Sequence, residues 1–115
     1  MTTIERRRSP RYPARIPVKV KTETGTYSGT SVNLSISGAC AVVHGEAKEF
    51  STLELFLELE VEVDGKEEVF SVHFPGVVVR AEPTEDRTVI AVMFQKIPVE
   101  SEWALSKYLL QRFTD

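Results

Sequence analysis

Hydrophobic and polar residues alternate along most of the chain with a period of two, which is typical of half-buried β-strands. The clearest run covers residues 53–63, where leucine or valine occupies every second position and glutamate occupies most of the others. Shorter runs predict five more strands, at about residues 16–21, 27–34, 39–43, 68–80 and 88–94. The pattern therefore predicts an antiparallel sheet of six short strands.

Turn-forming residues separate these runs. Asp64-Gly65 directly follows the longest strand, and this dipeptide fits a two-residue hairpin because both positions tolerate a positive φ. Pro75-Gly76 falls inside the returning strand and predicts a bulge or bend there.

After Pro98 the apolar residues recur at helical spacing, which predicts one C-terminal helix. The residues that define this spacing are Val99, Trp103, Leu110 and Phe113, with Leu105 and Leu109 nearby.

Together these elements predict an all-β fold with one C-terminal helix. Six strands with edges to protect favour an antiparallel β-barrel, and an amphipathic helix can cover one opening or edge. Because 115 residues suffice for only one sizeable core, we expect a single domain, with an arm at residues 1–15 and the barrel and helix at residues 16–115. The helix either packs against the barrel or presents Trp103, Tyr108 and Leu109 as an apolar patch for a dimer or partner.

Charge is distributed unevenly between the two ends of the sequence. Residues 1–21 hold seven positive side chains and one negative, a net charge of +6, whereas the remaining residues have a net charge of −9. Five of the seven are arginines, which bind phosphates and guanine edges bidentately, so the arm favours a nucleotide or phosphorylated partner. A solvated basic tail is the alternative interpretation. We expect this proline-containing arm to be mobile without an anion.

Several classes of protein are disfavoured. No apolar run is long enough to span a membrane and the charged beginning differs from a signal peptide, so we expect a cytoplasmic protein that does not bind membranes.

The single cysteine excludes an internal disulfide, and with His44 and His73 it gives no recognisable metal site. Cys40 with either histidine is a conceivable nucleophile pair, but its alanine and valine neighbours are typical of a buried residue, so we expect no enzyme, no catalytic residues and no cofactor. The glutamate-rich strand faces would repel a nucleic acid polymer, which argues against an oligonucleotide-binding barrel.

Two motifs carry candidate binding chemistry. An RxxxR spacing joins Arg7 to Arg11 within a denser arginine cluster, and an NxSxxG spacing joins Asn33, Ser35 and Gly38 at the end of the second predicted strand. Arginine can bind the O6 and N7 acceptors of guanine as well as phosphate, and asparagine and serine offer acceptors to the donor edge of the base. Alone, the second motif is also compatible with a polar turn whose side chains bind local backbone atoms.

The geometry of an extended chain gives the second motif a predicted arrangement. Residues 32, 34 and 36 are apolar and should point to one face, which leaves residues 33, 35 and 37 as a polar row on the other. We expect Gly38 to adopt a positive φ and to let a flat ligand approach the backbone.

These motifs, in this order and about twenty residues apart, resemble those of the PilZ domain family, bacterial receptors for cyclic di-GMP. Segments at residues 17–18, 76–80 and 91–94 also resemble strand signatures of the family. The resemblance implies a six-stranded split barrel with an N-terminal arm that wraps over the ligand. It implies that Arg7 and Arg11 clamp phosphate and guanine, and that Asn33, Ser35 and Gly38 seat a guanine. Asn33 stands where many members have aspartate, which makes a weaker contact to the base plausible.

The resemblance also implies less central contacts and a signalling role. Arg6, Arg8 and Arg80 would add positive charge near the ligand, and Arg6 resembles an arginine of members that bind a stacked pair of ligand molecules. The implied function is second-messenger binding, in which ordering of the arm transmits the signal to a partner protein or a neighbouring subunit. The alternative is a PilZ-like barrel that acts as an interaction adaptor without nucleotide. A monomer and a homodimer both stay open, and the sequence does not name the downstream pathway.

Overall fold

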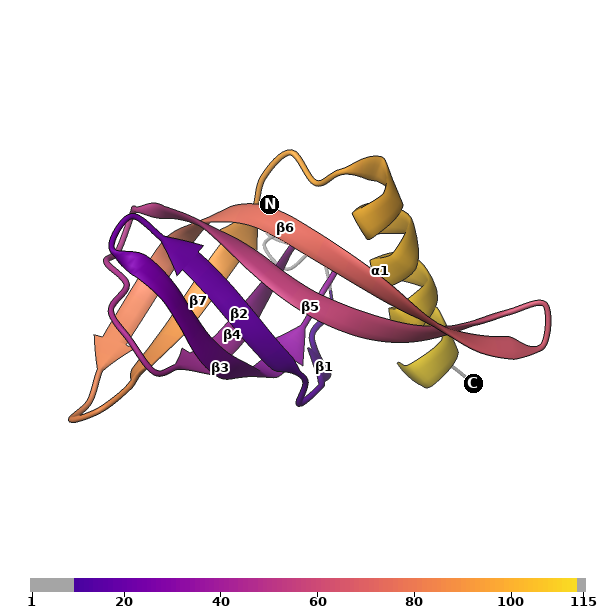
Figure 1. The fold of residues 1–115 in the computed structure, drawn as a ribbon, viewed down its shortest axis with the longest axis horizontal. Coiled ribbons are helices and arrows are strands. Elements are labelled where there is room, and N and C mark those ends of the chain that lie inside the picture. The colour runs from indigo at the N-terminus through magenta and orange to yellow at the C-terminus, as the bar shows by residue number, and fades with distance from the viewer. Residues whose placement is uncertain (1–9, 114–115) are drawn as a thin grey trace, which may run out of the picture.

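The computed structural model describes residues 10–113 (Figure 1). No helix in this part of the chain is both long and apolar enough to cross a membrane. The elements, in chain order, are β1 (Tyr12–Pro13), β2 (Pro17–Thr22), β3 (Gly25–Leu34), β4 (Gly38–Val43), β5 (Thr52–Val63), β6 (Lys66–Pro83), β7 (Thr88–Phe94) and α1 (Val99–Phe113).

The sheet closes on itself. Its strand order is β1-β3-β2-β5-β6-β7-β4, all neighbours are antiparallel, and β4 pairs back with β3. Strands β2 to β7 thus form a closed ring of six, which confirms the predicted antiparallel architecture with one C-terminal helix. The short β1, which falls within the predicted arm, pairs with β3 where β2 no longer does (Figure 1).

The core fills the ring and the space beneath α1. Every second residue of β5, from Leu53 to Val61, is buried, as its alternation predicts. Phe74 of β6 stacks on Phe94 of β7 with ring centroids 4.6 Å apart. Burial of this apolar surface is the main force that stabilises the ring and holds α1 against it.

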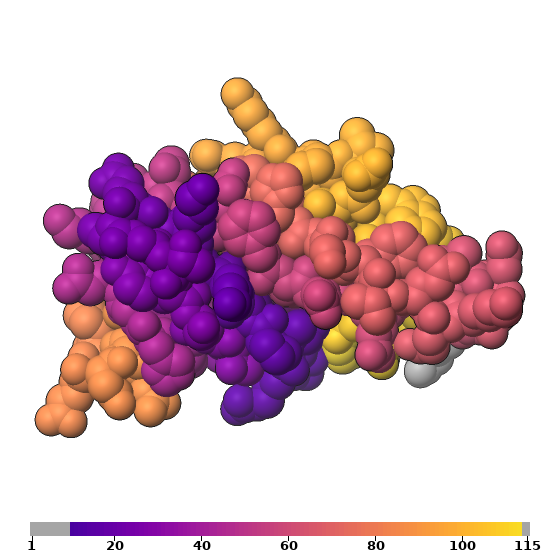
Figure 2. Space-filling view, viewed as in Figure 1, coloured from indigo at the N-terminus to yellow at the C-terminus, as the bar shows by residue number. Residues whose placement is uncertain are grey.

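The β5–β6 hairpin is longer than the ring requires. Asp64 and Gly65 form its turn with φ values of 53° and 82°, as the dipeptide predicts. The pairing of β2 with β5 ends at Val18 and Leu57, so the rest of the hairpin projects beyond the ring (Figures 1 and 2). Helix α1 lies alongside this projection and contacts both of its strands.

The predicted apolar face of α1 is only partly correct. The buried residues are Ser101, Ala104, Leu105, Tyr108 and Leu109. Val99, Trp103 and Leu110 fit a helical period equally well, yet their exposed fractions are 80%, 42% and 58%. Tyr108 and Leu109 therefore pack against the sheet instead of forming an exposed patch, whereas Trp103 keeps an edge contact with Phe70 at 5.4 Å.

The prediction of a bulge at Pro75-Gly76 is wrong. Strand β6 runs through both residues, which pair with Glu54 and Leu53 in a regular ladder. Proline is tolerated because pairing with β7 begins only at Gly76, so the missing N–H removes no ladder bond on that side. A glycine is required next to it because a Cβ there would lie 2.6 Å from Cγ1 of Val92.

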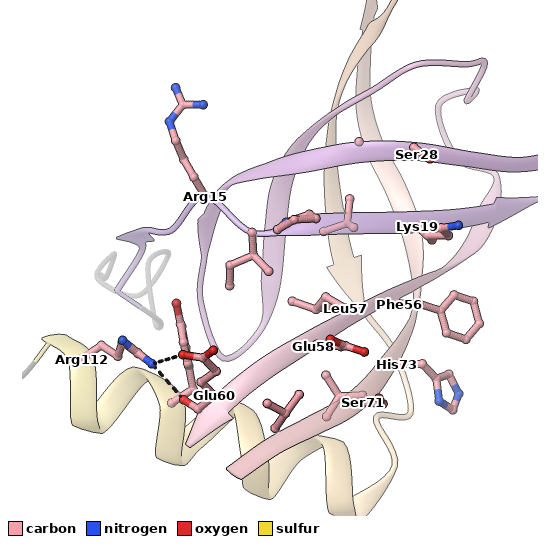
Figure 3. A pocket seen from close by; sticks show the side chains of 17 residues that line it. Arg15, Lys19, Ser28, Phe56, Leu57, Glu58, Glu60, Ser71, His73 and Arg112 are labelled. Carbon is pink, nitrogen blue, oxygen red and sulfur yellow. Dashed lines mark hydrogen bonds and ion pairs between the residues drawn. The ribbon is translucent and has the colours of Figure 1, made fainter. Parts of the chain in front are cut away.

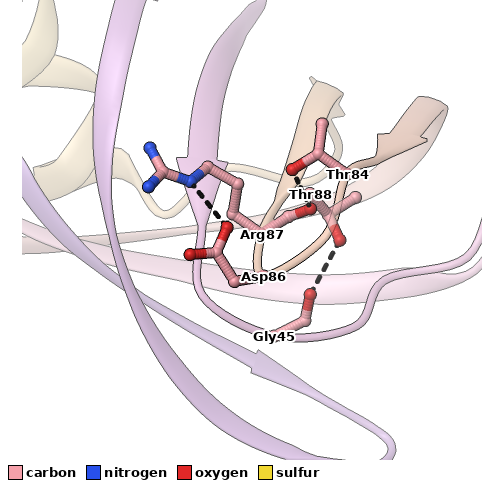
Figure 4. A network of polar contacts seen from close by, with 5 residues as sticks. All are labelled: Gly45, Thr84, Asp86, Arg87 and Thr88. Atoms are coloured by element: carbon pink, nitrogen blue, oxygen red, sulfur yellow. Dashed lines mark hydrogen bonds and ion pairs between the residues drawn. The ribbon is translucent and has the colours of Figure 1, made fainter.

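A small polar network fixes the end of the ring at the β6–β7 turn (Figure 4). The Thr88 hydroxyl donates to the carbonyl oxygen of Gly45 at 2.7 Å, which ties β7 to the loop after β4. Across the turn, the Thr84 hydroxyl donates to the carbonyl oxygen of Arg87 at 3.1 Å. A hydrogen bond from Arg87, together with its charge, lowers the pKa of Asp86.

Candidate functional site

One cross-strand row on the outer face of the ring brings together residues from four strands. Asn33 of β3 pairs with Cys40 of β4, Cys40 pairs with Ala91 of β7, and Ala91 pairs with Arg80 of β6. We call these four residues the outer row. Directly paired residues point to the same face, and three strand spacings separate Asn33 from Arg80 by roughly 14 Å along the sheet.

Two β-bulges place the polar ends of the outer row on the outside. In β6, Val78 is buried, and a regular alternation would turn Arg80 inward as well. The register shift between Val78 and Arg80 leaves Val79 as an extra residue, so that Arg80 pairs with Ala91 and faces outward. The shift between Ser31 and Asn33 in β3 has the same effect on Asn33.

The predicted faces, apolar at residues 32, 34 and 36 and polar at residues 33, 35 and 37, are wrong at Val32 and at Ser35, which is almost fully buried. Val32 is the extra residue and is 37% exposed, whereas the preceding Ser31 is fully buried. The alternation of faces is therefore reset between residues 31 and 33. Cys40, expected as a buried residue, lies on the outer face and is partly exposed.

Ser35 uses its hydroxyl to close the turn between β3 and β4. The oxygen accepts hydrogen bonds from the backbone N–H groups of Ser37 at 3.2 Å and Gly38 at 3.1 Å. The Ser35 N–H in turn donates to the Gly38 carbonyl oxygen at 2.9 Å, and the side chain is almost fully buried. The geometry matches the polar-turn interpretation of this serine, and the hydroxyl is already engaged without a ligand.

Gly38 is required for a different reason from the one expected. Among residues 10–113 the glycines with a positive φ are Gly25 and Gly65, so a positive φ at Gly38 is wrong. A Cβ at Gly38 would lie 2.3 Å from the carbonyl oxygen of Val92, because β4 and β7 approach closely there. The glycine thus allows the pairing that brings Cys40 beside Ala91.

The arginines are only partly described. Arg6, Arg7 and Arg8 lie outside the described residues. Arg11 is exposed and directly precedes Tyr12, whose partner Leu34 directly precedes Ser35, so Arg11 lies at the NxSxxG end of β3. Arg80 is exposed and its Nε lies 3.6 Å from a carboxylate oxygen of Glu82, a surface ion pair of small energetic weight.

Sequence reasoning missed two residues next to this site. Met93 is 49% exposed and lies two residues from Ala91 on the same face of β7, where it pairs with Gly38. The alternation of the last predicted strand contains this signal. Ser31 is the other residue: its hydroxyl accepts the N–H of Ile16 at 2.9 Å and donates to the carbonyl oxygen of Ala14. No local pattern could reveal these two contacts.

A cavity lies away from the outer row. It has a volume of about 930 Å³ and opens between the start of β2, the second half of β5 and the end of α1 (Figure 3). None of the predicted site residues that fall within residues 10–113 lines it. Burial raises the pKa of Tyr108 at its edge, and Arg112 opposes this shift. Within residues 10–113, no group of three or more His, Cys, Asp or Glu side chains is placed to hold a metal ion.

The fold and site define a small closed antiparallel β-sheet domain with a C-terminal helix and, on its outer face, the outer row with a polar residue at each end. The chain belongs to the PilZ domain family, which its sequence matches over residues 5–111. No curated protein matches the sequence.

Solved structures share this fold at low sequence identity. The Bacillus subtilis inhibitor of motility MotI/DgrA has a TM-score of 0.71 and 22% identity, over 95% of this chain and 51% of that protein. The chain therefore spans about half the length of that neighbour. The PilZ domain of Escherichia coli YcgR with c-di-GMP has a TM-score of 0.67 and 17% identity, over 93% of this chain and 91% of that domain. The PilZ domain of CeSA from a cellulose-synthesising bacterium has a TM-score of 0.54 and 21% identity, over 90% and 97%.

Proposed function

We propose that this protein binds cyclic di-GMP on the outer row and passes the signal to a partner protein. The observation that carries the proposal is the pair of bulges, which turn Asn33 and Arg80 outward on one row beside the NxSxxG turn. Membership of the PilZ family and the likeness to a YcgR domain determined with c-di-GMP support the choice of ligand.

The chemistry of the row suits a flat dianionic ligand. Between the two polar ends lie two small side chains, that of Cys40, which is partly exposed, and that of Ala91, which is 8% exposed, and Met93 offers an apolar edge. Arg7 and Arg11 would bind phosphate and guanine, with Arg6, Arg8 and Arg80 adding charge-assisted contacts. Asn33 would meet the base, whereas Ser35 and Gly38 would act by holding the turn on which the ligand rests.

Signal transmission has a physical route at the root of the arm. Tyr12 stacks on Phe113 at the end of α1, with ring centroids 4.9 Å apart. A nucleotide that draws the arm over the outer row would pull on Tyr12 and thereby on α1. A partner protein or a second subunit that contacts α1 would detect this change.

The decisive experiment is calorimetric titration with cyclic di-GMP, with linear GMP dinucleotide as the control ligand. Arg11→Ala should lower the affinity at least tenfold, because a charge-assisted bidentate contact contributes about 1.5–3 kcal/mol. The matched control is Arg87→Ala, which removes an exposed arginine at the distant β6–β7 turn and should leave the affinity unchanged.

Two outcomes would contradict the proposal. Absence of heat from folded protein at high ligand concentration would favour the alternative, an adaptor that binds only proteins. Equal affinities of the Arg11→Ala variant and the unaltered protein would remove Arg11 from the site.

A further inference from the structure

Strand β5 is longer than its partner β2. Pairing with β2 ends at Leu57, and from Glu58 to Val63 the ladder continues on the β6 side alone. Within the described part of the chain, no strand pairs with the other side of residues 58–63, which we call the edge segment. Such an edge is a template for an additional strand unless something covers it.

Side chains of α1 occupy the hydrogen-bonding groups of this edge. The Gln111 carboxamide accepts the N–H of Glu62 at 2.8 Å and donates to its carbonyl oxygen at 2.9 Å. These are the two bonds that an antiparallel strand residue would make. Arg112 donates to the carbonyl oxygen of Glu60 at 3.2 Å (Figure 3). The hydrogen-bonding groups of this edge are thus covered by two exposed side chains of α1.

Charge indicates what kind of strand the edge accepts. The even-numbered side chains of the edge segment, Glu58, Glu60 and Glu62, are all exposed. Residues 58–68 together hold six acidic side chains and one basic side chain. The segment would attract lysine and arginine and repel acidic chains.

The chain contains an example of such a partner. In β2, valine alternates with lysine, and this strand pairs with the first half of β5. Its buried valines, Val18 and Val20, face the core, and Lys21 stands directly opposite Glu54. An incoming strand with the same alternation would pair with β5 beyond the end of β2, with its lysines beside the glutamates of the edge segment.

The cavity between β2, β5 and α1 provides room along the same edge. It is lined by Leu57, Glu58 and Glu60 on one side and by Arg15 and Ile16 on the other. In Figure 3 the edge of β5 and the beginning of β2 diverge around this space. A short extended segment could enter without displacing β2.

We propose that the edge segment is a docking site for an extended basic peptide of a partner protein. The peptide pairs antiparallel with Glu58–Val63 and takes over the backbone bonds now made by Gln111 and Arg112. Its alternate lysine or arginine residues face the three glutamates, two of which line the cavity, and its apolar residues lie on the side of Leu59 and Val61. This binding does not depend on the proposed nucleotide function.

The test uses fluorescence anisotropy with the fluorescein-labelled peptide Thr-Val-Lys-Val-Lys-Val-Thr and the full chain. We expect saturable binding that weakens with salt. Gln111→Ala should tighten binding by about threefold or more, because the peptide no longer competes with the carboxamide for two hydrogen bonds. Glu62→Gln should weaken it, whereas Glu85→Gln, at the exposed β6–β7 turn, is the matched control and should have no effect.

A second peptide separates strand pairing from simple charge attraction. N-methylation of alternate amides keeps the charges and removes the backbone donors, and it should abolish binding. Equal binding of the methylated peptide, or no binding to either the unaltered protein or Gln111→Ala, would overturn the proposal. A third outcome would also overturn the proposal. If the NMR chemical shifts of the amides of residues 58–63 changed with protein concentration in the absence of peptide, the occupant of the edge would be a second copy of this chain.

Discussion

Two serine hydroxyls near the C-terminal end of β3 hold backbone segments together. Ser35 closes the turn to β4, and Ser31 joins the strand to Ala14 and Ile16 of the preceding segment. Motif spacing indicates Ser35, whereas no local pattern marks Ser31, because its partners lie 15 and 17 residues away in sequence. At the scale of residues, the sequence identifies residue types near the site. It does not show which polar atoms already form hydrogen bonds to backbone groups within the fold.

Ser31→Ala should destabilise the protein by about 1–3 kcal/mol, because it leaves the partly buried N–H of Ile16 and the buried carbonyl oxygen of Ala14 without their partner. Urea unfolding measures this difference. Ser28→Ala, at an exposed position of the same strand, is the control and should change the unfolding free energy by less than about 0.5 kcal/mol. A similar small effect at Ser31 would show that water replaces the hydroxyl.

Cys40 offers a direct probe of the outer row, because it lies between Asn33 and Ala91 and is the only cysteine in the chain. Cyclic di-GMP should slow its alkylation by a maleimide, and the alkylated protein should no longer bind the nucleotide. Mass spectrometry follows the reaction, and Cys40→Ser should retain binding. Alkylation at an unchanged rate with saturating nucleotide would place the ligand elsewhere.

At the scale of elements, local alternation located all six predicted strands and the helix, but it failed where a partner strand sets the register. The bulges at Val32 and Val79 arise from pairing with β4 and β7, and no local pattern marks them. The buried face of α1 shows the same limit. Two apolar stripes fit the helical period, and the position of the β5–β6 hairpin decides which of them is buried.

The contact between α1 and the sheet should weaken at high pH. Burial raises the pKa of Tyr108 above the model-compound value of 10.0, so the folded state holds the phenolic proton more tightly than the unfolded state. The resulting stability is complete below that value and is lost as the pH rises through the raised pKa. Unfolding titrations at increasing pH should show this decline, and Tyr108→Phe should lack it. Equal declines in both proteins would exclude Tyr108 as the cause.

For the molecule as a whole, the sequence predicted the closed sheet and the place of the NxSxxG turn, but not the outer row that crosses four strands. Arg80 and Asn33 are distant in sequence, and only the complete ring brings them to one row. The contact of Tyr12 with Phe113 was equally hidden, because it joins the two ends of the described chain. Features that depend on closure follow from the whole ring and not from any one segment.

This contact predicts communication between the arm and α1. Cyclic di-GMP should change amide hydrogen exchange in α1, and Phe113→Ala should reduce that change while altering nucleotide affinity much less. Hydrogen exchange with mass spectrometry provides the first measurement and calorimetry the second. An undiminished response in α1 of Phe113→Ala would rule out the aromatic stack as the route.

Each of the two bulges adds one residue beyond those that pair with β4 or β7. Val32 and Val79 are partly exposed residues without a counterpart in β4 and β7, so the loss of either one would leave the remaining pairs with those strands as they are. Loss of Val32 would also remove the hydrogen bond from the Ala14 N–H to its carbonyl oxygen. Removal of a residue from the regular middle of β5 would instead turn its buried leucines outward. In related chains, a one-residue gap at either bulge is therefore compatible with the same outward-facing surface, whereas a gap in β5 would signal a rearranged core.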